Sequence, residues 1–75
     1  MQNHTKREII LDAMQELMNG SSAQAISVSD IAQKAGIGKG SIYSYFSSKN
    51  DIIEAVIERS YSRAIEKARA LAASG

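Results

Sequence analysis

Cysteine is absent from this sequence, and histidine occurs only once, as His4. Without cysteine there can be no disulfide, and a single histidine cannot build a structural zinc site of the common spacing. A chain of 75 residues forms one domain at most and retains little net stability, because conformational entropy nearly cancels the gain from apolar burial. Stability must therefore come from helix packing, or from a partner or further domain.

Proline is also absent, and no segment approaches the roughly 20 apolar residues that a membrane-spanning helix needs. Residues 1–7 are mostly polar and are not followed by a long apolar run, so no secretory signal of ordinary build is expected. The composition is typical of a helical, cytoplasmic protein without a membrane partner.

The net charge of +1 says little, but its distribution is uneven. Residues 33–50 contain Lys34, Lys39 and Lys49 and no acidic residue, and they are rich in serine and glycine. An acid-free basic segment in an otherwise neutral chain indicates a local anion-binding face.

Apolar residues recur at helical spacing and predict an all-α domain. The expected helices cover residues 5–18, 27–35, 39–45 and 49–71. We expect Asn19 and Gly20 to end the first helix in a left-handed conformation. Ser27 and Asp30 stand in capping-box relation at the start of the second helix, and Gly36 ends it.

The second and third helices have the features of a helix-turn-helix unit. Ala32 supplies a small residue where the helices cross, and Gly36 tolerates the positive φ that the turn needs. Ile42 anchors the third helix toward the core, as does Phe46 after it. The alternative is an unrelated small helical bundle.

The run from Ile31 to Asp51, IAQKAGIGKGSIYSYFSSKND, resembles the core motif of the TetR family of repressors. The matching positions are Ile31-Ala32, Ala35-Gly36-Ile37, Gly40-Ser41-Ile42-Tyr43, Phe46 and Lys49. The resemblance implies a homeodomain-like, TetR-type fold, in which residues 1–48 form a helix-turn-helix three-helix bundle. Residues 49–75 would then be a long connecting helix that leads to a C-terminal ligand-binding and dimerisation domain outside this chain.

The resemblance also implies a function, namely sequence-specific binding of double-stranded DNA as the operator-reading domain of a transcriptional repressor. The full-length protein would be a homodimer on a palindromic operator, and a small-molecule effector would act only through the C-terminal domain. We expect no cofactor and no enzymatic activity, since no histidine or acid set is placed to activate a serine nucleophile.

Residue by residue, the family motif implies a set of DNA contacts. Ser27 would touch the DNA backbone, Lys39, Gly40 and Ser41 would face the major groove, Tyr43 and Lys49 would bind phosphate, and Tyr45 would lie at the groove edge. The full candidate set is Ser27, Gly38, Lys39, Gly40, Ser41, Tyr43, Ser44, Tyr45 and Lys49. Gly38 departs from the family pattern, which usually has Ser or Thr at this position.

Physical arguments support several of these residues. Gly38 and Gly40 allow backbone N–H groups to approach phosphate closely, and a helix N-terminus favours an anion. Lys49 lies in the first turn of its helix, where the macrodipole disfavours a cation unless an anion binds beside it.

Less specific interpretations stay open. Tyr43 and Tyr45 could be packing residues, Lys39 could be an ordinary solvated lysine, and Lys6 and Arg7 could reach DNA or remain in solvent. The main alternative function is a small helical protein-interaction module that docks through the apolar stripe of residues 61–71. Such a module would not need the acid-free segment or its glycines.

Overall fold

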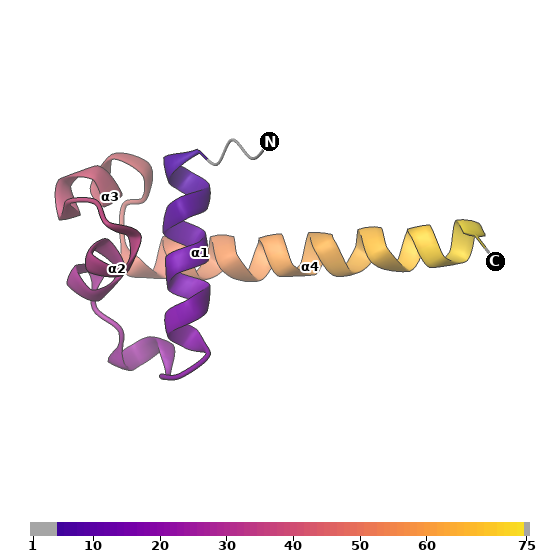
Figure 1. The fold of residues 1–75 in the computed structure, drawn as a ribbon, viewed down its shortest axis with the longest axis horizontal. Helices are drawn as coiled ribbons and strands as arrows, with labels where there is room; N and C mark the ends of the chain where they lie inside the picture. The colour runs from indigo at the N-terminus through magenta and orange to yellow at the C-terminus, as the bar shows by residue number, and fades with distance from the viewer. Residues whose placement is uncertain (1–4, 75) are drawn as a thin grey trace.

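Every regular element in the described part of the chain is helical, which confirms the predicted all-α class. The computed structural model describes residues 5–74, so His4 lies outside it. The elements are α1 (Lys6–Met18), the short 3₁₀ helix η1 (Ala23–Ala25), α2 (Val28–Ala35), α3 (Lys39–Tyr45) and α4 (Lys49–Ser74). Helices α1, α2 and α3 gather around the start of α4, whose remainder projects away from them (Figure 1). Within residues 5–74, no helix is both long and apolar enough to cross a membrane.

Capping boxes begin α1 and α2. The Thr5 hydroxyl accepts from the Glu8 N–H at 3.1 Å, and the Glu8 carboxylate accepts from the Thr5 N–H at 3.3 Å. Ser27 and Asp30 repeat the arrangement at 3.0 and 2.9 Å, which confirms the predicted capping box. Each box satisfies backbone donors that a helix N-terminus otherwise leaves without partners.

The ends of α1 and α2 differ. Gly36 closes α2 with a φ of 76°, in the left-handed region, as expected. The left-handed stop predicted after α1 is wrong, because Asn19 has a φ of −69° and Gly36 is the one described residue with positive φ. The Asn19 and Gly20 N–H groups instead turn back onto the last carbonyls of α1, a right-handed ending that needs no special conformation.

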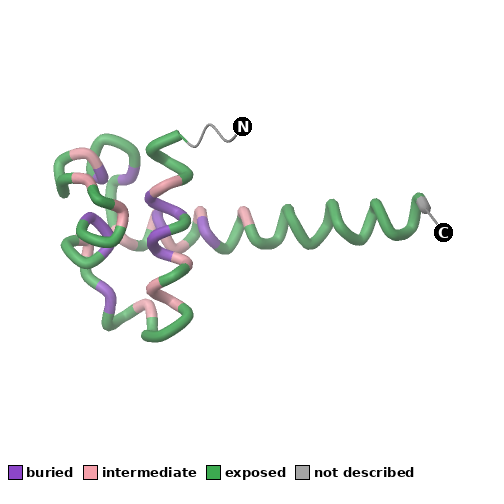
Figure 2. The backbone as a smooth tube through the Cα atoms, viewed as in Figure 1, coloured by how far each residue is buried: buried purple, intermediate pink, exposed green. Residues whose placement is uncertain are grey.

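One core unites α1, α2, α3 and the first two turns of α4 (Figure 2). Its buried members are Ile10, Leu11, Ala13, Met14, Ile26, Ile31, Ala32, Ile42, Phe46, Ile52 and Val56. Because Ile52 and Val56 belong to α4, this core extends across the boundary predicted between residues 48 and 49. Beyond Val56 the apolar residues of α4 are exposed, including Ile57, Tyr61 and Leu71.

Candidate nucleic-acid interface

Helices α2 and α3 pack together as a helix-turn-helix pair through the features expected of one. Ala32 is only 5% exposed, and Ile42 is fully buried on the inner side of α3. At the turn, the Gly36 and Ile37 N–H groups both donate to the Ala32 carbonyl, at 2.9 and 3.0 Å. This closed turn fixes the direction in which α3 leaves α2, and it leaves the side of α3 opposite Ile42 without protein cover.

The uncovered side of α3 carries Lys39, Gly40, Tyr43 and Ser44, all exposed. Their i, i+1, i+4, i+5 spacing places them on one helix face, which we call the α3 face. Tyr43 is 52% exposed, so about half of its surface is open to a partner. The Ser44 hydroxyl donates to the Gly40 carbonyl at 3.1 Å, which holds its oxygen against the helix. The structure therefore brings four of the candidate residues together.

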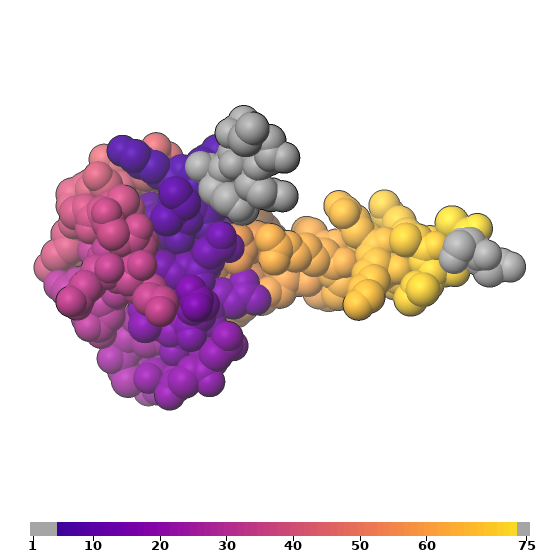
Figure 3. Space-filling model, in the orientation of Figure 1, coloured from indigo at the N-terminus to yellow at the C-terminus, as the bar shows by residue number. Residues whose placement is uncertain are grey.

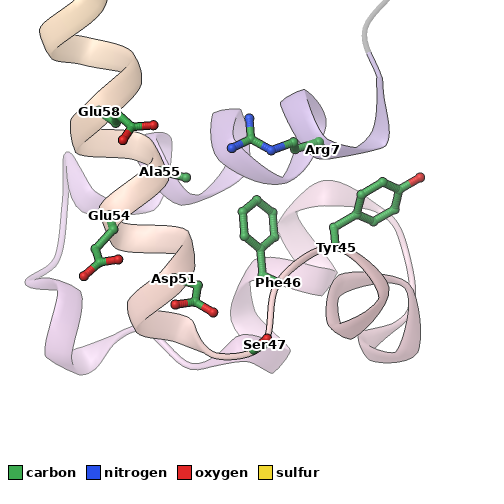
Figure 4. Close-up of a pocket in the computed structure, with 8 residues that line it drawn as sticks. All are labelled: Arg7, Tyr45, Phe46, Ser47, Asp51, Glu54, Ala55 and Glu58. Carbon is green, nitrogen blue, oxygen red and sulfur yellow. The ribbon is translucent and has the colours of Figure 1, made fainter.

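Other candidates lie off the α3 face. Ser41 and Tyr45 are one turn apart on the neighbouring side, where Ser41 is half-buried. Tyr45 lines a hollow with Arg7, Phe46 and acidic residues of α4, among them Asp51 and Glu58 (Figure 4). A hollow lined by acidic residues does not attract phosphate. Tyr45 therefore lies at the border between this hollow and the α3 face.

Phe46 and Arg7 meet at this hollow. The Arg7 guanidinium lies over the Phe46 ring, 5.5 Å from its centroid, a distance at which a cation is attracted to an aromatic face. Phe46 is only 7% exposed, which confirms it as a core residue. Arg7 thus covers the core, which favours this contact over a DNA contact for its side chain.

The start of α2 presents Ser27 together with a negative charge. Hydrogen bonds from Ser27, first from its backbone N–H and then from its side chain, lower the pKa of Asp30 below the ordinary value of 3.8. The Asp30 carboxylate is therefore anionic at neutral pH and lies beside Ser27, whose hydroxyl oxygen is engaged in the capping box. Gly38, the N-cap of α3, makes no side-chain capping bond and is exposed.

Lys49 contacts backbone carbonyls of its own chain, and its phosphate contact stays a prediction. Its ammonium group donates to the carbonyl oxygens of Ala23 at 3.0 Å, Gln24 at 3.4 Å and Ile26 at 2.9 Å. A lysine has three N–H donors, so this arrangement leaves none for a phosphate. The partners are backbone atoms of a segment more than twenty residues away in the chain, and no sequence pattern predicts such a contact.

Within residues 5–74, no group of three or more His, Cys, Asp or Glu residues is placed to hold a metal ion. The structure presents a helix-turn-helix pair in which the α3 face is exposed and carries no acidic residue.

Comparison with known proteins agrees with this geometry. The model of the family described as "Bacterial regulatory proteins, tetR family" matches residues 10–56, which is more than half of the chain. The chain is 44% identical over 57 residues to the uncharacterized HTH-type transcriptional regulator YvdT of Bacillus subtilis, covering 76% of this chain and 29% of that protein. It is 33% identical over 64 residues to the HTH-type transcriptional regulator AlkX of Mycobacterium tuberculosis, covering 85% of this chain and 30% of that protein.

The chain thus spans less than a third of the length of these curated relatives. No solved structure gave a significant match. The family match runs from the middle of α1 through the helix-turn-helix pair to Val56, the last buried residue of α4, and so covers the core and the α3 face together. The chain belongs to the tetR family of bacterial regulatory proteins.

Proposed function

We propose that this chain is the operator-reading domain of a transcriptional repressor and that it binds double-stranded DNA with the α3 face in the major groove. The observation that carries the proposal is the α3 face itself, a set of exposed polar groups on a helix that is anchored from behind by Ile42. A helix presented in this way fits the width of the major groove. The α3 face itself carries no acidic residue, so a phosphate group would meet no carboxylate on it.

Gly40 supports a close approach of DNA to the backbone of α3. Glycine costs roughly 0.5–1 kcal/mol relative to alanine in the middle of a helix, and Gly40, the second residue of α3, bears at most this cost. A β-carbon at Gly40 would meet nothing within 4 Å, so packing within the domain gives no reason for its absence. A nucleic-acid surface lying against the helix at this point supplies one, because it needs the space that a side chain would occupy.

We assign the contacts by chemistry. Lys39 donates to acceptor groups on base edges at the start of α3, and Gly40 and Ser44 lie beside it. Tyr43 donates its hydroxyl proton to a phosphate, while Ser27 and the backbone at Gly38 flank the same strand. Ser41 and Tyr45 occupy the groove edge.

A single α3 presents few side chains to bases, so tight and selective binding needs two copies. We propose that the full-length protein is a homodimer on a palindromic operator, with half-sites one helical turn or a multiple of it apart, about 34–36 Å per turn. Effector binding would belong to regions beyond this chain. Such a regulator acts in the compartment that holds the chromosome, which is the cytoplasm in bacteria.

The Gly40→Ala variant tests the proposal. We expect it to raise the thermal stability of the free protein, because alanine favours the helix and its β-carbon has room. We expect it to weaken binding to duplex DNA, measured by fluorescence anisotropy at low salt, because the methyl group holds the helix away from the groove. Gly20→Ala is the matched control, since Gly20 also has open space around it but lies beyond α1. Unchanged DNA binding by the Gly40→Ala variant would argue against the proposed docking.

The exposed apolar residues of α4 favour a second candidate, a protein-interaction module. Ile57, Tyr61 and Ile65 follow one another at four-residue spacing, and they are 58%, 69% and 37% exposed. Ile57 and Tyr61 line a hollow with Met18 and Asn19 at the end of α1. Farther along, α4 projects away from the other helices (Figure 3). This function does not depend on DNA, so a failure of the chain to bind duplex DNA at any salt concentration would favour it.

A further inference from the structure

The ammonium group of Lys49 lies at the junction between η1 and α2. Its acceptors are the Ala23 and Gln24 carbonyls of η1 and the carbonyl of Ile26, which directly precedes the N-cap of α2. The bonds to Ala23 and Ile26 are short, at 3.0 and 2.9 Å, and both are partly buried. Lysine 49 itself is half-buried, unlike Lys39, which is exposed.

The position of this cation follows from helix electrostatics. In the first turn of α4 the macrodipole disfavours a positive charge, whereas backbone carbonyl oxygens attract one. The Ala23 carbonyl already accepts from the Ile26 N–H at 3.3 Å, and its second lone pair accepts from Lys49. The side chain of Lys49 extends away from the N-terminus of α4, so that its ammonium group contacts the carbonyl oxygens of η1. Backbone carbonyl oxygens of the same chain thus stabilise the Lys49 ammonium group, as the phosphate expected from the sequence would have done.

The contact also completes the frame around α3. Ile26, only 3% exposed, holds the start of α2 in the core, and Phe46 holds the end of α3 there. Helices α2 and α4 each pack on α1. Lys49 adds a direct polar link between the first turn of α4 and the residue before α2, so both ends of the helix-turn-helix pair are fixed relative to α4.

We propose that Lys49 is a positioning residue, which sets the orientation of the helix-turn-helix pair on α4 through the carbonyls of Ala23, Gln24 and Ile26 and makes no contact with phosphate. Its effect on DNA binding rests on the proposed function, whereas its effect on the free protein does not. Loss of the ammonium group loosens the segment from Ala23 to Ser27 and lowers the fraction of molecules that present α2 and α3 correctly.

The salt dependence of DNA binding separates positioning from phosphate contact. Each phosphate that a protein cation neutralises contributes about 0.9 to the slope of log Kobs against log salt concentration. A positioning residue changes the affinity at every salt concentration by the same factor and leaves this slope unchanged. A phosphate ligand lowers the slope by about 0.9 when it is removed.

The experiment compares the wild type with Lys49→Met, which keeps the length of the side chain and loses its charge, and with Lys67→Met as a matched control on exposed α4. Amide hydrogen exchange of residues 23–28 is measured in the free proteins, and binding of a random-sequence duplex is measured over a range of salt. We expect faster exchange at residues 23–28, several-fold weaker binding and an unchanged slope for Lys49→Met alone. A slope lowered by about 0.9, or exchange identical to the wild type, overturns the proposal.

A second measurement uses the unaltered protein, in case Lys49→Met does not fold. In nitrogen-15 spectra of the lysine ammonium groups, Lys49 is expected to exchange its protons with water more slowly than Lys39 and to keep its signal position when duplex DNA is added. A Lys49 signal that exchanges as fast as the others, or that shifts with DNA, contradicts the positioning role. Failure of the wild type to bind DNA overturns the proposed function, while the free-protein data still decide the position of Lys49.

Discussion

Arg59 of α4 joins Asp12 of α1 by a hydrogen-bonded ion pair, with Nη1 of the guanidinium 2.8 Å from the Asp12 carboxylate oxygen. The second terminal nitrogen, Nη2, donates to the Gln15 side-chain carbonyl at 2.6 Å. Asp12 and Gln15 are three residues apart and share one face of α1. Arg59 lies one turn beyond Val56, the last core residue of α4, so it extends the contact between the two helices past the end of the core.

This pair predicts a measurable coupling between α1 and α4. The side chain of Arg59 is 16% exposed and that of Asp12 is 49% exposed, so solvent screens the interaction and we expect a coupling energy of about 0.5–1 kcal/mol. Urea unfolding of Arg59→Ala, Asp12→Ala and the double variant gives this energy directly. Arg63→Ala, on the exposed part of α4, serves as the control. A coupling energy of zero from this double-mutant cycle would show that the ion pair does not stabilise the packing of α4 on α1.

Gly36 predicts a loss of stability that comes from backbone conformation alone. Its φ is 76°, and a β-carbon at this position would meet no atom within 4 Å. Gly36→Ala should therefore lower the free energy of unfolding by about 1–2 kcal/mol, since alanine is strained in the left-handed region. Gly36→Asn should lose less, because asparagine tolerates that region. Equal stability of the alanine variant and the wild type would contradict the left-handed turn.

Asp30 predicts a pH dependence confined to acid. Because its pKa is lowered in the folded state, its capping interaction is fully present above the ordinary value of 3.8 and is lost as the pH falls through the lower folded-state pKa. Tm should therefore be higher for the wild type than for Asp30→Asn at neutral pH. The difference in Tm between the two proteins should narrow below pH 3.8. A gap that stays constant from neutral pH into strong acid would mean that Asp30 acts through something other than its charge.

The helix-turn-helix pair could be predicted because its determinants are local. The bounds of α3 follow from Gly38 before it and from Ser47 and Ser48, which interrupt the helical pattern after it. The start of α2 follows from the Ser27–Asp30 capping box. The position of the α3 face follows in turn from Ile42, since a buried anchor defines which side of a short helix is free.

Other features depend on contacts between distant segments and could not be predicted. The helix η1 has the sequence Ala-Gln-Ala, which is too short for periodicity, and its N-cap Ser22 makes no side-chain capping bond. The acceptors of Lys49 are backbone carbonyls, which every residue has, so the sequence suggested a phosphate instead. Asn19 and Gly20 tolerate a left-handed ending, but the carbonyls of Glu16 and Leu17 were within reach of a right-handed one.

The central claim is that the α3 face binds double-stranded DNA, and the most direct test is the salt dependence of duplex binding by the wild type and two lysine variants. Lys39→Ala removes the cation of the α3 face, and Lys67→Ala removes an exposed cation far along α4. We predict that affinity of the wild type falls steeply as salt rises, that Lys39→Ala binds more weakly than the wild type, and that Lys67→Ala binds as the wild type does. Binding that is absent or independent of salt, or that weakens with Lys67→Ala and not with Lys39→Ala, would contradict the claim.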